Sequence, residues 1–227
     1  MTGARLLWYF YSQADVLIAG KLLGRELVGA YSVAMHLASL PVQKLSSILN
    51  QVAFPAFAQT QHDLKLVAQY ILKSLRLLWL VAVPILWGIS SIAGEIVDVI
   101  LGPNWQPAVV PLQLLPLIMP LSMISPFLNT AFQGIGHGGV VFRNVLTASV
   151  VLPPAFLLGA NWELLGLSLA WVLGFPVVLA MNLRRMLPLV GLRLDQVLAA
   201  AAPAALSGCG MYVSVVLTRY VAEIVEA

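Results

Sequence analysis

The chain of 227 residues is 60% hydrophobic and only 9% charged, with a mean hydropathy of +0.93. Soluble domains carry about 25% charged residues, so this composition excludes an ordinary soluble domain and indicates a membrane protein. The formal net charge of +3 does not indicate a nucleic-acid partner, because the basic residues do not gather on one aromatic-rich surface. The lone cysteine, Cys209, cannot form a disulfide within the chain.

Apolar stretches of about 20 residues, long enough to cross a bilayer as helices, recur along the entire sequence. They predict an all-α fold, a polytopic transmembrane helix bundle that forms a single domain over residues 1–227. We expect about seven spans, at residues 6–23, 28–57, 75–92, 109–132, 140–158, 164–183 and 197–217.

Polar and proline residues interrupt several of these spans. Ser12, Gln13 and Asp15 lie in the middle of the first span, and no small-residue cleavage pattern follows, so we interpret it as a spanning helix and not as a signal peptide. Pro41 predicts a kink or a break in the second span. Prolines are also dense in and before the fourth span, which favours a helix bent around a cavity.

Two spans carry polar side chains at steps of three and four residues, which places those side chains on one face of a helix. In the second span they are Ser32, His36, Ser39, Gln43, Ser46 and Asn50, and in the fourth they are Ser122, Ser125, Asn129 and Gln133. Polar groups cannot face lipid unpaired, so the two polar faces predict a shared, water-filled lumen. This pattern favours a transporter.

The distribution of basic residues predicts the orientation of the bundle. Following the crossings from Met1, one side collects Arg5, Lys65, Lys73, Arg76, Arg143, Arg184, Arg185 and Arg193, whereas the other collects Lys21, Arg25 and Arg219. Cationic loops stay in the cytoplasm, so the N-terminus is expected inside. Residues 61–76 read either as an amphipathic helix at the cytoplasmic surface or as an ordinary solvated helix entry.

Residues 14–57 resemble the seventh and eighth helices of the multidrug/oligosaccharidyl-lipid/polysaccharide exporter superfamily, and most closely its bacterial polysaccharide flippases. The residues that carry the resemblance are 15–20 (DVLIAG), 23–24 (LG), 28–34 (VGAYSVA), 40–41 (LP) and 52–55 (VAFP). Residues 95–102 with Trp105, and 131–134 with Gly136, resemble the ends of the ninth and tenth helices. The resemblance is dense over residues 12–136 and thin after Ala148.

The resemblance implies two pseudo-symmetric bundles that rock around a hydrophilic cavity and carry a lipid-linked sugar to the outer leaflet. This chain would supply only the second bundle. The implied partners are a polyprenyl-diphosphate-linked oligosaccharide, membrane lipids, and a missing N-terminal bundle or a second chain. No cofactor, metal site or nucleic-acid partner is expected. The implied location is the bacterial cytoplasmic (inner) membrane, as a multi-pass protein.

The resemblance also suggests substrate contacts. The related lipid II flippases have an Ala-Asp-Arg-Leu motif whose arginine meets the substrate pyrophosphate, and the matching run 34–37 reads AMHL here, with His36 in place of the arginine. Histidine is only partly charged at neutral pH, so Lys44 is expected to supply charge to the diphosphate together with His36. Gln43 and Asn50 complete this polar face. Asn129 and Gln133 either bind sugar hydroxyls or join helices.

Asp15 resembles an aspartate that contributes to a sodium site in the lipid II flippases. Such an oxygen-rich site needs further ligands, for which Ser12 and Asn144 are candidates. The alternative is an ion pair of Asp15 with Lys44 or Arg143 that fixes helix packing, and Lys44 has the further alternative of reaching an interface.

We therefore expect a cation-coupled secondary transporter that exports lipid-linked oligosaccharide units for surface polysaccharide biosynthesis. A drug or metabolite exporter of the same superfamily is one alternative, and a membrane enzyme of envelope polysaccharide assembly is another. The sequence contains no motif that pairs a nucleophile with a base, and its three histidines share no metal-ligand spacing, so an enzyme is not expected.

Overall fold

The computed structural model describes residues 9, 11–60 and 62–226, which form helices joined by turns, with no strand among them. The α-helices are α2 (Ala14–Leu22), α3 (Arg25–Thr60), α4 (Leu64–Ser91), α5 (Ala93–Ile96), α6 (Val109–Ser122), α7 (Ile124–Gly134), α8 (Gly138–Gly159), α9 (Glu163–Met186) and α10 (Leu194–Glu226). A π-helix, η1 (Val97–Leu101), and three 3-10 helices join them: η2 (Pro103–Ala108), η3 (Ala160–Trp162) and η4 (Leu187–Val190). The predicted all-α fold is confirmed.

Four stretches of the described residues are long and apolar enough to cross a membrane: Leu64–Ser91, Pro103–Gly134, Gly138–Val190 and Leu194–Arg219. The third stretch contains two helices, α8 and α9, that run alongside each other. The chain is therefore a multi-pass membrane protein, and α3, which holds the second expected span, is not among these four stretches. The first expected span begins at residue 6 and falls partly outside the described residues.

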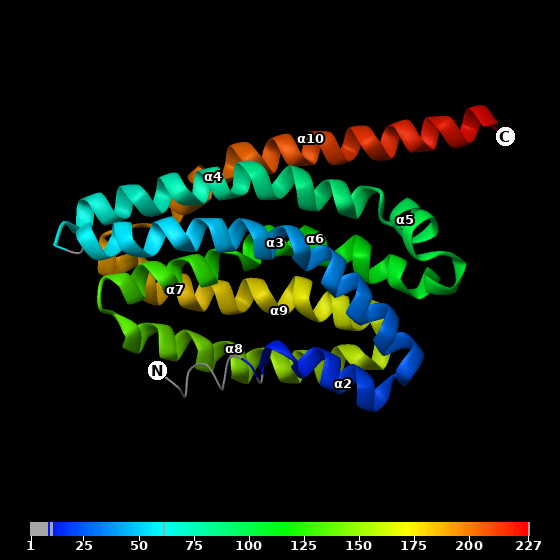
Figure 1. The fold of residues 1–227 in the computed structure, drawn as a ribbon, viewed down its shortest axis with the longest axis horizontal. Helices are drawn as coiled ribbons and strands as arrows, with labels where there is room; N and C mark the ends of the chain where they lie inside the picture. The colour runs from blue at the N-terminus through cyan, green and yellow to red at the C-terminus, as the bar shows by residue number, and fades with distance from the viewer. Residues whose placement is uncertain (1–8, 10, 61, 227) are drawn as a thin grey trace.

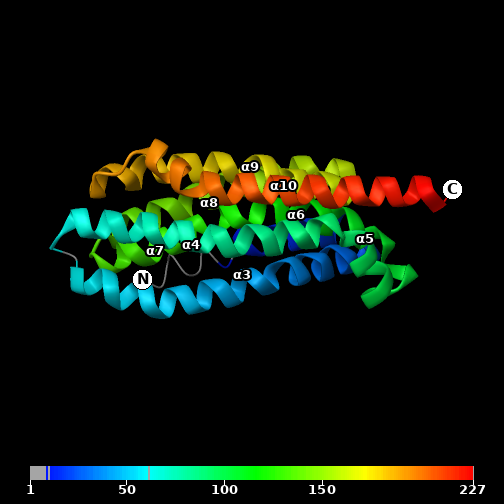
Figure 2. The ribbon, with the colours of Figure 1, turned by 90° about the horizontal axis from the view of Figure 1, so that it is seen from above.

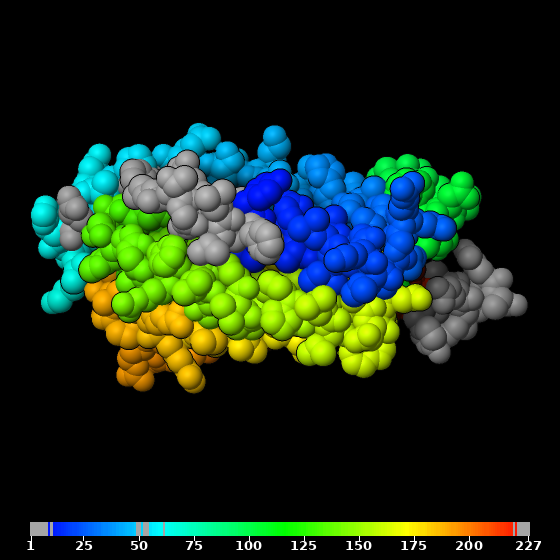
Figure 3. Space-filling view, turned by 90° about the horizontal axis from the view of Figure 1, so that it is seen from below, coloured from blue at the N-terminus to red at the C-terminus, as the bar shows by residue number. Residues whose placement is uncertain are grey.

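The long helices run nearly parallel along the long axis of the molecule (Figure 1). Figure 2 shows α3 along one side of the bundle and α9 with α10 along the opposite side. The space-filling view in Figure 3 shows α2 between α3 and α8. Two apolar clusters fill the interior, one including Leu86, Leu112, Leu152 and Phe156, and the other including Phe132.

Proline has different effects on the helices of the second and the fourth expected spans. Helix α3 continues through Pro41 without a break, and Figure 1 shows it bending along its length. Of the kink or break predicted at Pro41, the break is absent and the helix bends instead. The fourth span is interrupted at Met123, between α6 and α7. Pro126 follows three residues later and has no N–H to donate to the Ser122 carbonyl, which weakens the helix at this point.

The two ends of the bundle carry different charges. The ends of α3 and α7 and the starts of α4, α8 and α10 meet at one end (Figure 1). This basic end carries Lys65, Lys73, Arg76, Arg143, Arg184, Arg185 and Arg193, together with the acidic residues Asp63 and Asp195. The opposite end carries Lys21, Arg25 and Arg219 together with the acidic residues Glu26, Glu95, Asp98 and Glu163.

Helices α8 and α9 approach each other closely where the turn joins them. A Cβ atom added at Gly166 would clash with the Gly159 carbonyl oxygen, and one added at Gly159 would clash with the Gly166 backbone. Small residues at such contacts let membrane helices pack backbone to backbone. Glu163, the first residue of α9, has a positive φ of 53°, which few residues other than glycine adopt.

Candidate functional site

A groove of about 380 Å³ lies between α2, α3, α6, α7 and α9. Its polar lining comes from Ser12, Gln13, Asp15, Ser39, Ser122, Ser125 and Asn129, and apolar residues such as Met35, Leu115 and Phe175 complete the wall. The groove thus joins one residue of the first polar face with three of the second. The interruption between α6 and α7 lies on its wall, because Ser122 and Ser125 flank Met123.

Most of the first polar face lies outside this groove. His36, Gln43 and Lys44 are exposed on α3, and no salt bridge involves Lys44 among the described residues. The Gln43 amide donates to Ser39 Oγ over 3.0 Å, and that hydroxyl donates to the His36 carbonyl over 2.9 Å. The Asn50 side chain lies outside the described residues. Helix α3 therefore presents polar and charged side chains on its open side, together with the exposed apolar residues Leu40 and Ile48.

Asp15 is 1% exposed and lies where α2, α3 and α9 meet. One carboxylate oxygen accepts from Tyr31 Oη at 2.9 Å and from Trp171 Nε1 at 3.0 Å. The other oxygen accepts from the Val16 amide at 2.8 Å. The ion pairs with Lys44 and Arg143 do not occur in the described part of the chain. Neutral donors thus satisfy both oxygens of this carboxylate.

A second buried polar group joins α7, α8 and α9. The Asn144 amide is 2% exposed and donates to Asn129 Oδ1 at 3.3 Å and to Met186 Sδ at 2.9 Å. Asn144 Oδ1, Asn182 Oδ1 and Ser125 Oγ are buried and have no hydrogen-bond partner. All three residues line a cavity of about 20 Å³. Each buried unpaired polar atom costs about 1–3 kcal/mol, so the site favours a water molecule or a ligand that brings positive charge or a donor.

The three residues expected to form a cation site are therefore distributed between two places. Asp15 and Ser12 line the groove, where Ser12 Oγ also donates to the Tyr9 carbonyl over 3.0 Å, and Asn144 lines the small cavity. The two spaces adjoin, because Tyr11, Ser125, Asn129 and Phe175 line both. No cluster of three His, Cys, Asp or Glu residues that would hold a metal ion occurs among residues 9, 11–60 and 62–226.

Two residues of these sites were not singled out from the sequence. Trp171 reaches Asp15 across 156 positions of the chain, and nothing in its local sequence indicates that contact. Asn182 does have a signal, because it is an amide inside the apolar stretch 164–183. Gln133, in contrast, lies exposed near the end of α7 and lines neither the groove nor the cavity.

Comparison with known proteins adds independent evidence about the class of protein to which this chain is similar. Residues 1–110 match the model of a family described as "Polysaccharide biosynthesis protein". The chain is 31% identical over 153 residues to the amylovoran biosynthesis protein AmsL of Erwinia amylovora, covering 66% of this chain and 39% of AmsL. It is 30% identical over 164 residues to the succinoglycan biosynthesis transport protein ExoT of Rhizobium meliloti, covering 70% and 32%. The lipopolysaccharide biosynthesis protein WzxC of Escherichia coli is 24% identical over 174 residues, covering 76% and 35%.

These similarities confirm the predicted resemblance to polysaccharide flippases. The matched region is well under half the length of each of these relatives. No solved structure matches the chain.

Proposed function

Starting from this similarity to polysaccharide biosynthesis and transport proteins, we propose that the chain forms one helix bundle of an exporter of lipid-linked oligosaccharide units. The observation that carries the proposal is the polar open side of α3, with His36, Gln43 and Lys44 exposed beside a groove lined by four further helices. Such a surface is costly against lipid and suits the wall of a hydrophilic path.

In this proposal, a second helix bundle faces the open side of α3. It is supplied by a longer form of the protein or by another chain, and it closes the path between the two bundles. Transport then follows alternating access, in which one bundle rocks against the other around the path between them.

The proposed location is the bacterial cytoplasmic membrane, with the basic end of the bundle and the N-terminus in the cytoplasm. The separation of charges supports this orientation, because the basic end carries five arginines and two lysines: Lys65, Lys73, Arg76, Arg143, Arg184, Arg185 and Arg193. Basic residues near the ends of membrane helices are retained on the cytoplasmic side.

In the proposed substrate contacts, Lys44 and His36 bind the diphosphate of the polyprenyl-linked sugar. The Lys44 ammonium has no salt bridge in the described part of the chain, so its charge is available to an anionic ligand. Gln43, Asn50 and Gln133 are assigned to sugar hydroxyls, and Asn129 to the wall of the groove.

We place the coupling cation in the cavity at Asn144. Oxygen atoms are the ligands that hard cations prefer, and Asn144, Asn182 and Ser125 offer three buried oxygens without partners. Asp15 and Ser12 line the adjoining groove, where the carboxylate attracts cations toward the cavity.

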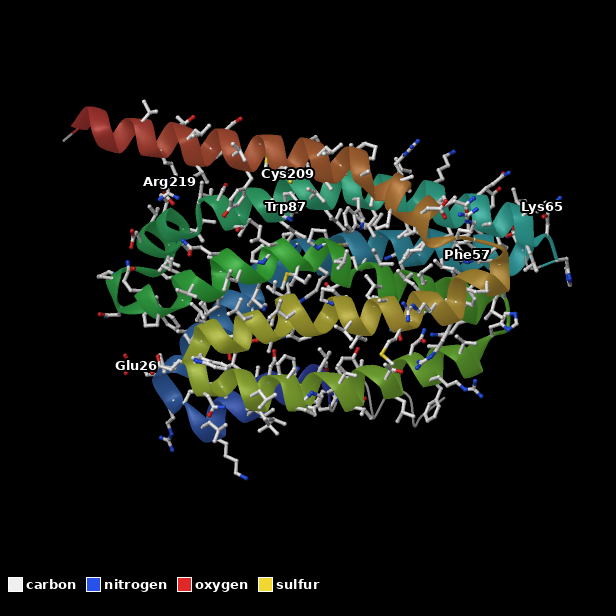
Figure 4. The ribbon with its side chains drawn as sticks, turned by 180° about the vertical axis from the view of Figure 1, so that it is seen from behind. Glu26, Phe57, Lys65, Trp87, Cys209 and Arg219 are labelled. Atoms are coloured by element: carbon white, nitrogen blue, oxygen red, sulfur yellow. The ribbon has the colours of Figure 1, made fainter. Side chains whose placement is uncertain are left out.

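The test is a Lys44→Ala substitution in the protein as the cell makes it. We expect surface polysaccharide to be lost while the protein level in the membrane stays unchanged, because the diphosphate loses its charged contact. Lys65→Ala is the matched control, since Lys65 is an exposed lysine of α4 at the basic end (Figure 4), away from the groove. Normal surface polysaccharide from Lys44→Ala refutes the proposal.

A further inference from the structure

Helix α10 lies on the outside of the bundle, packed along α4 (Figure 4). At mid-length Gly208 touches α4 closely, because a Cβ atom there would clash with Val83 Cγ1 and lie 2.9 Å from Trp87 Cε3. Near the end of α4, Arg219 donates to the Ser91 carbonyl at 2.8 Å and forms a salt bridge to Glu95 at 3.0 Å. These contacts fix the middle and the far end of α10.

The two helices separate at the basic end. A groove of about 430 Å³ opens there, lined by Leu72, Lys73 and Arg76 of α4 and by Gln196, Ala199 and Ala200 of α10. The space exists because α10 contributes alanines where a larger side chain would fill it. Exposed apolar residues continue from this groove along both helices, including Leu77, Leu80, Leu198 and Leu206.

The polar part of this groove is cationic. Lys73 and Arg76 are exposed and lie three residues apart, so they project from one face of α4. Neither forms a salt bridge among the described residues, whereas Arg193 pairs with Asp195 at 3.1 Å and Arg219 pairs with Glu95. The groove therefore presents two uncompensated positive charges at its polar end and an apolar floor below them.

We propose that this groove binds an anionic phospholipid, with the phosphate of the headgroup on Lys73 and Arg76 and an acyl chain along the apolar surface of α4 and α10. Basic pockets between membrane helices on the cytoplasmic side bind anionic headgroups, and guanidinium and ammonium groups both pair with phosphate. The assignment to the inner leaflet rests on the proposed orientation of the bundle. The exported lipid is not the occupant, because α10 and α3 lie on opposite sides of the bundle (Figure 2).

The test measures phospholipid affinity by native mass spectrometry of the purified protein, titrated with phosphatidylglycerol and separately with phosphatidylcholine. We expect the Lys73→Gln/Arg76→Gln double variant to bind phosphatidylglycerol at least about tenfold more weakly, because each basic group contributes to headgroup attraction. Phosphatidylcholine binding should not change. Lys65→Gln is the matched control, since it removes one charge from the same helix outside the groove.

A second variant tests the shape of the groove without changing its charge. Ala199→Phe should weaken phosphatidylglycerol binding by filling the space, whereas Ala202→Phe, on an exposed position of α10 that does not line the groove, should leave binding unchanged. Equal affinity of wild type and double variant for phosphatidylglycerol overturns the proposal. Displacement by inorganic phosphate alone, or preferential binding of a polyprenyl diphosphate, also overturns it.

These outcomes are separate from the test of export. Phospholipid affinity is measured without substrate and without transport. Normal polysaccharide from Lys44→Ala therefore refutes the exporter and leaves the lipid site standing, and unchanged lipid affinity refutes the lipid site alone.

Discussion

Asp15 and Asn144 are both buried polar residues inside the bundle, yet their surroundings differ in one respect. Both oxygens of the Asp15 carboxylate accept hydrogen bonds from Tyr31, Trp171 and Val16. The Asn144 oxygen has no donor, and neither does the Asn182 oxygen across the same cavity. A satisfied group stabilises the native helix packing, whereas unpaired acceptors favour a bound ligand, so the two residues are suited to different tasks.

The largest effect on stability is expected at Asp15. Asp15→Ala removes the acceptor for three donors and should lower the free energy of unfolding by about 2 kcal/mol. Thermal unfolding of the purified protein in detergent measures this change. Asp15→Asn is the control, because an amide oxygen still accepts from Tyr31 and Trp171. Equal stability of Asp15→Ala and wild type contradicts a structural role.

A smaller loss of stability is expected from a substitution at Tyr31, which is fully buried and donates a hydrogen bond to Asp15. Tyr31→Phe keeps the ring and removes the donor to Asp15 and the second acceptor of Trp171 Nε1, which still donates to Asp15. The free energy of unfolding should fall by about 0.6 kcal/mol, as for interhelical hydrogen bonds in other membrane proteins. The same unfolding measurement applies. Combining Tyr31→Phe with Asp15→Ala should cost less than the sum of the two single losses, because the two residues share the hydrogen bond between them.

The smallest effect on stability is expected at Asn182. Asn182→Leu replaces an unpaired polar group with an apolar one, so the free energy of unfolding should stay within about 1 kcal/mol of wild type. Stabilisation of the protein by sodium should disappear in the same variant, because one of three oxygen ligands is lost. A sodium response identical to that of wild type contradicts cation binding in this cavity.

The sequence predicted the helices well because hydropathy sets the length of a span, and it also placed Ser39 and Asn129 on polar faces. The sequence did not show which of the proline-containing helices would be interrupted. Pro41 is accommodated within a continuous helix, whereas the interruption lies at Met123, and that outcome depends on packing against neighbouring helices.

The membership of the buried clusters depends on contacts between residues distant in the chain. Trp171 approaches Asp15, and Asn182 joins the cavity of Asn144, only because α9 packs against α2 and α8. A single sequence records hydrophobic periodicity along each helix but not the rotation of one helix against another. For that reason Asp15 and Asn144 were expected in one site and lie in two adjoining spaces.

The length of α3 bears on the depth of its lysine in the proposed arrangement. A helix of 36 residues is about 54 Å long, which exceeds a hydrocarbon core of about 30 Å, so part of α3 must extend into water. Lys44 follows Arg25 by 19 positions, a rise of about 28 Å from the outer end of the helix. In the proposed orientation, with Arg25 at the outer boundary, the Lys44 ammonium group lies near the inner boundary of the hydrocarbon, where the cost of burying a charge is lower than at the midplane. In the proposed exporter, Lys44 therefore lies at the level at which a lipid-borne diphosphate would leave the inner leaflet.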